Sequence, residues 1–180
     1  MHSPVRAVIE FKNIEFDYVP GKLVLHDVSV RVEAGESVAL VGKSGAGKSS
    51  FVNLIPRFYD PVFGVIHPDG VDVRDLRIHD LRDHIGYVPQ MPMLFNASIA
   101  NNIRAGKQDA SDEEVLQAAR DANAHEFIEQ FNQGFDTVLS ERGNSLSGGQ
   151  CQRIAIARAF LKNAPILVFG RGDLSLGQRK

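Results

Sequence analysis

The chain of 180 residues is 43% hydrophobic and 23% charged, enough for one core or one core with an appendage, and its net charge of −2 gives no reason to expect nucleic acid as a partner. We expect no secretory signal and no membrane span, because the opening residues are not apolar and no run approaches the ~18 apolar residues that a span needs. A single cysteine, Cys151, excludes an internal disulfide and suits a reducing compartment.

The N-terminal part of the chain alternates apolar and polar residues, as strands with one solvated face do. Residues 8–18 have period-two apolarity with a break near Asn13, which predicts one strand or two. Residues 28–32 alternate in the same way and predict another half-buried strand. We therefore expect an antiparallel β portion, followed at residues 38–41 by a buried strand.

Residues 42–49 read Gly-Lys-Ser-Gly-Ala-Gly-Lys-Ser, which is the P-loop pattern, between that predicted strand and a predicted helix. Backbone N–H groups in such a loop form a nest for phosphate, with Lys48 reaching the β- and γ-phosphates and the Ser49 hydroxyl ligating Mg²⁺. The alternative is a flexible Gly/Ser turn with a stray lysine. The residues expected to surround the phosphates are Gly42, Lys43, Ser44, Gly45, Ala46, Gly47, Lys48, Ser49 and Ser50.

The middle of the chain predicts a short strand and then several helices. The compact apolar run at residues 85–88 predicts a strand that stops at Pro89. Ser111 opens a segment with the spacing of a capping box, which predicts a helix over residues 115–123. Residues 124–130 predict a second, shorter helix.

A second glycine-rich stretch, Leu-Ser-Gly-Gly-Gln at residues 146–150, follows these helices. Ser147 and Gln150 again have capping-box spacing, so a long helix is expected to begin at Ser147 and to end near Asn163. The apolar run at residues 166–169 predicts a buried strand, parallel to the strand at 38–41 and next to it.

With these two glycine stretches in this order, the chain resembles the nucleotide-binding domain of an ABC transporter of the exporter type. The resemblance runs from about Ile9 to Phe169 and includes the family's signature motif at 146–150. It implies an α/β fold of the P-loop NTPase class with an N-terminal antiparallel β portion and an inserted helical subdomain. The expected division is a β portion and P-loop core over 1–90 and 158–169, with a helical subdomain over 91–157.

The resemblance also implies roles for three further sites. Tyr18 would stack on adenine, although it could also be an ordinary tyrosine at a sheet edge. Gln90 would touch Mg²⁺, act with Lys48 in catalysis and couple to the membrane domain, and its alternative is a turn glutamine. The stretch Glu141-Arg142-Gly143 resembles a loop that exporters use against their membrane domain, or is a plain solvated turn.

In the family, the signature helix faces ATP bound by a second copy, so two domains would form a head-to-tail homodimer. The residues expected to touch that ATP are Ser147, Gly148, Gly149 and Gln150. An ordinary helix N-cap is the alternative. Cys151 stands where most relatives carry arginine, a departure expected to weaken the dimer contact, and we expect its thiol to be buried and inert rather than reactive.

The segment between the P-loop region and the signature leaves one question open. Its residues 91–102 resemble those of exporters of lipids or hydrophobic compounds. Phe95, Ile99 and Ile103 would face either the core or the coupling helices of a membrane domain, and periodicity does not separate the two.

The resemblance breaks after Phe169, where the family continues with Asp-Glu and this chain continues with Gly170 and Arg171. Neither residue ligates a metal or acts as a general base, and Asp173 lies too far along to replace them. One inserted guanine would convert codons for a family sequence, F-D-E-A-T-S-A-L-D-R-E-S-E, into the residues printed here and a stop. We therefore expect residues 170–180 to be an out-of-frame tail, with the C-terminal part of the domain missing.

The sequence thus predicts the ATP-binding cassette of an exporter, located at the cytoplasmic face of a membrane, with ATP and Mg²⁺ as cofactors. Its expected partners are a second nucleotide-binding domain and the transmembrane domain of an exporter of lipids or hydrophobic compounds. This chain is expected to bind ATP but to hydrolyse it poorly, because the general-base glutamate is absent. Two alternatives stay open: a non-catalytic ATP-dependent dimerisation module or pseudogene product, and a soluble P-loop ATPase unconnected to transport.

Overall fold

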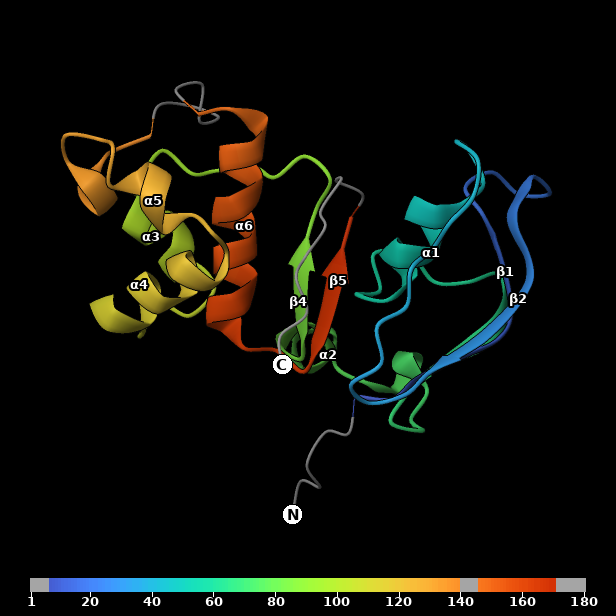
Figure 1. Ribbon diagram of the computed structural model, residues 1–180. Helices are drawn as coiled ribbons and strands as arrows, with labels where there is room; N and C mark the ends of the chain where they lie inside the picture. The colour runs from blue at the N-terminus through green and yellow to red at the C-terminus, as the bar shows by residue number, and fades with distance from the viewer. Residues whose placement is uncertain (1–6, 140–145, 171–180) are drawn as a thin grey trace, which may run out of the picture. The chain divides into compact units, whose positions relative to one another are not determined.

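The computed structural model describes residues 7–139 and 146–170, and the chain divides into two compact units, residues 1–85 and 86–180 (Figure 1). The first unit contains a three-stranded antiparallel sheet in the order β2-β1-β3, made of β1 (Ile9–Asp17), β2 (Leu23–Val32) and β3 (Phe63–Pro68). Along β2, half-buried and exposed residues alternate, as expected for one solvated face. The predicted antiparallel β portion is therefore confirmed.

The break predicted near Asn13 is a bulge within one continuous strand. Asn13 has a φ of 49°, and the pairing with β2 shifts register between Phe11 and Ile14. The Asn13 side-chain amide donates to Asp27 Oδ1 at 2.8 Å, and its backbone N–H donates to Ser29 Oγ at 2.9 Å. These bonds satisfy polar groups that the interrupted ladder leaves unpaired.

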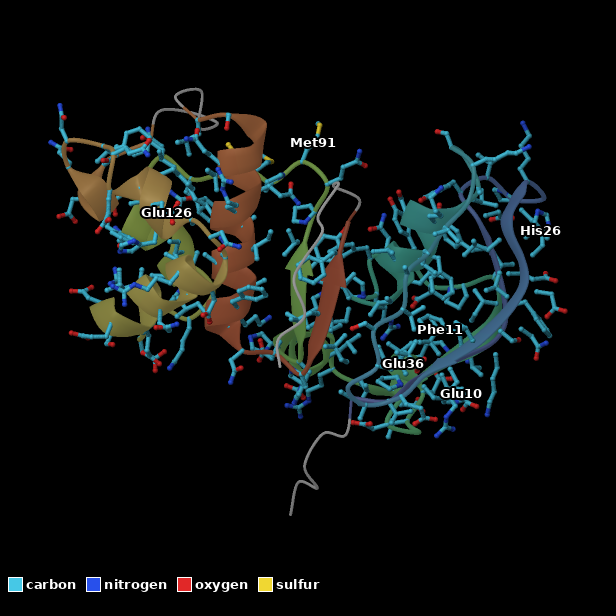
Figure 2. The ribbon with its side chains drawn as sticks, viewed as in Figure 1. Glu10, Phe11, His26, Glu36, Met91 and Glu126 are labelled. Carbon is cyan, nitrogen blue, oxygen red and sulfur yellow. The ribbon has the colours of Figure 1, made fainter. Side chains whose placement is uncertain are left out.

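Helix α1 (Lys48–Leu54) packs against the sheet of the first unit. The ring centroid of Phe51 lies 4.4 Å from that of Phe11, the residue of β1 that is labelled in Figure 2. Phe51 and Leu54 are buried there, so the apolar face of the helix and the inward residues of β1 form the core of this unit. The short elements η1 (Val73–Asp75) and α2 (Ile78–Asp83) complete it.

The segment before α1 differs from the sequence prediction. Residues 36–43 form no strand, and Val38, Leu40 and Val41 are 46%, 40% and 89% exposed. A strand needs a hydrogen-bonded neighbour, and none of the strands in the described residues pairs with this segment. The prediction of a buried strand at 38–41 is therefore wrong for this structure.

The second unit contains a two-stranded sheet of β4 (Ile85–Val88) and β5 (Ile166–Phe169), whose arrows point the same way in Figure 1. Both strands have the bounds that the sequence predicts. The neighbour of β5 was predicted wrongly, since β5 pairs with β4 and not with residues 38–41. Pairing partners lie far apart in sequence, and an apolar run does not specify them.

The helices of the second unit are α3 (Ile99–Arg104), α4 (Asp112–Asp121), α5 (His125–Ile128) and α6 (Gly148–Lys162), with the short turn η2 (Gly134–Asp136). Helix α6 packs against α3 and α4 (Figure 1). Its N-cap Ser147 and its C-cap Asn163, with a φ of 51°, confirm the predicted bounds of the long helix. No helix in the described ranges is both long enough and apolar enough to traverse a lipid bilayer.

The structure shows which of Phe95, Ile99 and Ile103 face the core of the second unit, a point that periodicity does not decide. Ile99 and Ile103 are fully buried among the residues of α3, α4 and α6. Phe95 is 58% exposed and lies under the Arg158 guanidinium, 5.1 Å from its ring centroid. The two isoleucines are therefore core residues, whereas Phe95 lies at the surface.

Candidate nucleotide-binding site

The P-loop residues form a turn that is closed by the side chain of Lys48. The Lys48 ammonium donates to the carbonyl oxygens of Gly42 at 2.8 Å and Lys43 at 2.7 Å. Within the loop, the Ala46 N–H donates to the Lys43 carbonyl at 3.2 Å. An ammonium has three donors, so these two bonds leave one for a phosphate oxygen while they hold the loop around the amine.

Gly47 is the residue that the loop conformation depends on most. It is the N-cap of α1 with a φ of 78°, a left-handed conformation that side chains other than glycine adopt at a cost. A Cβ at this position would lie 2.8 Å from Leu25 Cδ2 and 2.9 Å from the Val24 carbonyl oxygen. The loop thus lies directly against β2, with no space for a side chain between them.

The two serines that begin α1 have different environments. Ser49 is exposed, and no hydrogen bond found in the described residues uses its hydroxyl, so that oxygen is available to a metal ion. Ser50 is 6% exposed and its Oγ accepts a hydrogen bond from the Tyr18 hydroxyl at 3.0 Å. The structure therefore brings Tyr18, from the end of β1, into direct contact with the helix that follows the P-loop.

Tyr18 belongs to a small aromatic cluster that sequence reasoning missed. Its ring lies edge-to-face against Phe16, with centroids 4.8 Å apart, and against Tyr59, with centroids 5.2 Å apart. Tyr18 itself is 51% exposed, so part of the ring faces solvent. Tyr59 comes from the loop after α1, and no periodicity in the sequence connects it with Tyr18.

The signature stretch lies in the second unit and has a different construction. The Ser147 hydroxyl accepts from the Gln150 N–H at 3.3 Å, and the Gln150 Oε1 accepts from the Ser147 N–H at 2.8 Å. This is the predicted capping box. Among residues 7–139 and 146–170, a Cβ added to Gly148 or Gly149 would meet nothing within 4 Å, so packing within these ranges does not require either glycine.

Cys151 lies one residue after this capping box and packs partly against the core of the second unit. Burial raises the pKa of its thiol, which keeps the thiol protonated and poorly nucleophilic near neutral pH. This direction agrees with the expectation of an inert thiol rather than a reactive one.

Gln90 is exposed and directly follows β4 and Pro89. Beside it lies Gly170, the first residue after β5, whose N–H donates to the Val88 carbonyl at 2.7 Å. A Cβ at position 170 would lie 2.7 Å from the Gln90 backbone nitrogen. The pairing of β4 with β5 thus brings together the predicted metal-touching glutamine and the position where the family carries its aspartate.

The structure assembles the predicted residues in two groups. Tyr18 and residues 42–50 form one group in the first unit, whereas Gln90 and residues 147–150 belong to the second. Among the described residues, no group of three or more His, Cys, Asp or Glu side chains could hold a metal ion. The stretch Glu141-Arg142-Gly143 lies outside the described residues, as do Arg171 and Asp173.

Comparison with known proteins gives matches along most of the chain. The family model described as ABC transporter matches residues 25–169. The chain is 51% identical over 168 residues to the ATP-dependent lipid A-core flippase of Syntrophus aciditrophicus, a match that covers 93% of this chain and 28% of that protein. It is 51% identical over 177 residues to the protein of the same name from Haemophilus influenzae, covering 97% of this chain and 30% of that protein.

A solved structure gives the same result at the level of the fold. The structure of a bacterial Atm1-family ABC exporter with ATP bound superposes with a TM-score of 0.88 at 47% sequence identity, covering 91% of this chain and 29% of that chain. The chain therefore spans less than a third of the length of each of these relatives.

Proposed function

Because the chain belongs to the ABC transporter family, we propose that residues 42–50 bind the phosphates of ATP and that Tyr18 stacks on the adenine. The observation that carries this proposal is the position of the Lys48 ammonium on the carbonyls of Gly42 and Lys43. With those bonds in place, the lysine needs no large rearrangement to reach a phosphate, and binding costs little ordering of its side chain.

Ser49, at the start of α1, is the residue of the first unit that would ligate Mg²⁺ beside the phosphates, and Gln90 is the residue to which the family resemblance assigns a contact with Mg²⁺. The free hydroxyl of Ser49 and the exposed amide of Gln90 are oxygen donors of the kind that Mg²⁺ takes. A bound Mg²⁺ would neutralise charge on the β- and γ-phosphates. The chain itself supplies the cradle: the loop backbone orients the phosphates, and Lys48 compensates their charge.

We further propose that this domain works in an exporter of lipids or hydrophobic compounds at the cytoplasmic face of a membrane. Two of its relatives are named lipid A-core flippase, and the similar solved structure is that of an exporter. In this proposal, a second copy faces the first head to tail, and Ser147, Gly148, Gly149 and Gln150 touch the ATP of that copy. The open space around the two glycines supports such a contact, because none of the described residues would lie within 4 Å of a Cβ at either position.

The chain should bind ATP far better than it hydrolyses it. Hydrolysis needs a carboxylate that activates water, and such general-base help contributes roughly 10²–10⁴ in rate. After Phe169 the chain presents Gly170 and Arg171, neither of which can accept that proton. We therefore expect turnover close to the detection limit.

Titration calorimetry with Mg·ATP tests the binding proposal. Charge-assisted hydrogen bonds contribute roughly 1.5–3 kcal/mol, so Lys48→Ala should weaken binding at least about tenfold. Lys12→Ala is the matched control, because it removes another exposed lysine, on β1, that is not among the residues proposed to bind ATP. Equal affinity of the Lys48→Ala variant and the unchanged chain would refute the P-loop assignment.

Measurement of ATP turnover tests the proposal that this chain hydrolyses ATP poorly. The chain as it is should be compared, at equal folded concentration, with a chain in which Asp-Glu follows Phe169 and the family sequence continues in frame. The restored chain should turn over ATP at least about a hundredfold faster. Equal turnover by both chains, abolished by Lys48→Ala in each, would show that the tail does not remove catalysis.

Sedimentation of the chain with and without ATP reports on the proposed dimer.

A further inference from the structure

Three aromatic side chains of the first unit meet beside the P-loop helix. Phe16 is 2% exposed and fixed in the core, whereas Tyr18 and Tyr59 are 51% and 45% exposed. The ring centroid of Tyr59 lies 5.5 Å from that of Phe16 and 5.2 Å from that of Tyr18, and the planes of the two tyrosine rings meet at 89°. Tyr59 therefore contacts both the buried member and the exposed member of the cluster.

These contacts determine how the Tyr18 ring is oriented. A tyrosine has two side-chain torsions, and a half-exposed ring at the end of a strand has little else to restrict them. Here two rings pack nearly perpendicular to it, and its hydroxyl donates to Ser50 Oγ at 3.0 Å. The ring is thus fixed at both ends before any nucleotide arrives.

The link to Ser50 has a second effect. Ser50 is buried in the first turn of α1, the helix that begins at Lys48. The Tyr18 hydroxyl therefore connects the strand that carries the ring with the helix that begins at the phosphate-binding lysine. This hydrogen bond therefore fixes the Tyr18 ring relative to the helix that follows the phosphate-binding loop, in addition to the packing of α1 on the sheet.

We propose that Tyr59 is a positioning residue for the base of the nucleotide: it holds the Tyr18 ring in the orientation in which adenine stacks, and the Tyr18–Ser50 hydrogen bond fixes that ring relative to the P-loop. This inference rests on the proposed ATP binding. It assigns to Tyr59 no contact with the phosphates, so it predicts an effect on ligands that carry a base and none on ligands that lack one.

The test compares Mg·ATP with Mg·tripolyphosphate, which has the phosphates but no base, by titration calorimetry on the full chain. Aromatic pairs and single hydrogen bonds of this kind correspond to roughly 2- to 10-fold in affinity. Tyr59→Leu should weaken ATP binding by about this factor and leave tripolyphosphate binding unchanged. Tyr59→Phe, which keeps the ring, should bind both ligands as the unchanged chain does.

Two further variants separate positioning from packing. Tyr18→Phe removes the bond to Ser50 but keeps the ring, so it should lower ATP affinity less than Tyr18→Ala and also leave tripolyphosphate binding unchanged. Phe63→Leu is the control, because Phe63 is a similarly exposed aromatic residue, 62% exposed on β3, outside the cluster. It should alter neither ligand.

The outcomes distinguish the two proposals. If Tyr59→Leu weakens both ligands equally, or neither, while both still depend on Lys48, the positioning role is wrong and the P-loop assignment stands. If neither ligand depends on Lys48, the proposed ATP binding fails and the role of Tyr59 fails with it. Should Tyr59→Leu not fold, the Tyr18→Phe result decides: an unchanged ratio of ATP to tripolyphosphate affinity overturns the proposal.

Discussion

The two glycine-rich stretches of this chain resemble each other in sequence and differ in what holds them. The P-loop precedes a helix of seven residues whose N-terminus has no side-chain cap. Two features hold the loop: Gly47 packs directly against β2, and the Lys48 ammonium donates hydrogen bonds to two loop carbonyls. The signature begins a helix of 15 residues, which is closed by a capping box and packed on the core of the second unit.

This difference shows which glycines serve the fold and which do not. Gly47 has no room for a side chain, so the chain needs a glycine there in order to fold. Gly148 and Gly149 have open space around them and stand in the first turn of a helix, where glycine only weakens the helix. Within the described residues, no packing contact accounts for glycine at these two positions.

The largest expected effect on stability distinguishes a buried position of the second unit from an exposed position just before the P-loop. Ile103→Ala, at a fully buried position of the second unit, should lower the free energy of unfolding by roughly 2–5 kcal/mol. Val41→Ala, just before the P-loop at 89% exposure, should change it by less than about 0.5 kcal/mol. Urea denaturation measures both. Comparable losses at the two positions would mean that residues 38–41 are packed in solution.

The next effect concerns the glycines themselves. Gly47→Ala combines a left-handed backbone with contacts under 3 Å, and should destabilise the chain by roughly 1–3 kcal/mol. Gly149→Ala should be neutral or stabilise it by up to about 1 kcal/mol, because alanine favours the helix. The two substitutions are chemically identical, so each is the control of the other in the same denaturation experiment. Destabilisation by Gly149→Ala would overturn the distinction drawn between them.

The capping box gives a smaller effect. Ser147→Ala removes the acceptor of the Gln150 N–H and should lower the free energy of unfolding by about 1 kcal/mol. Ser147→Asp, which restores an acceptor, should recover most of the loss. Thermal denaturation of the three chains measures this. A Ser147→Ala chain that melts like the unchanged one would show that packing alone fixes the start of α6.

The smallest effect is a pH dependence confined to the first unit. Asp72 caps η1, and its bond with Arg74 lowers the carboxyl pKa from 3.8 to about 2. A pKa lowered by folding contributes stability that is present above 3.8 and is lost as the pH falls toward 2. Asp72→Asn should remove this part of the acid sensitivity, as measured by denaturation between pH 5 and pH 2. The Ser147–Gln150 cap does not ionise, so removing it should shift stability equally at every pH. Identical acid sensitivity with and without Asp72 would contradict the assignment.

Much of the fold could be predicted because its signals are local. The capping box at Ser147 fixes the start of α6 through a side chain three residues away, and the short apolar runs at 85–88 and 166–169 end where the strands do. The capping box at Ser111 is also present, but α4 covers Asp112–Asp121 and so begins three residues before the predicted 115–123. The expected fold class, an ABC ATPase domain of mixed α/β structure, is confirmed by the family match and the Atm1-family exporter.

The errors and omissions are all non-local. Whether residues 38–41 form a strand depends on a neighbour that supplies a ladder, and composition does not report one. The contact of Tyr18 with Tyr59 and Ser50 depends on how the loop after α1 returns to the end of β1. The site residues themselves came from motif and resemblance, and their roles stay predictions until ligand binding is measured.

The close approach at Gly170 restricts which side chains the chain can carry directly after β5. In the present arrangement, any side chain at position 170 would place its Cβ 2.7 Å from the Gln90 nitrogen and 3.2 Å from the Val88 carbonyl oxygen. Because both neighbours are backbone atoms, an aspartate introduced by one codon change would have to force the ends of β4 and β5 apart. A carboxylate at position 170 therefore requires a wider separation of these two strand ends, whereas the glycine found there lets the backbones lie in direct contact.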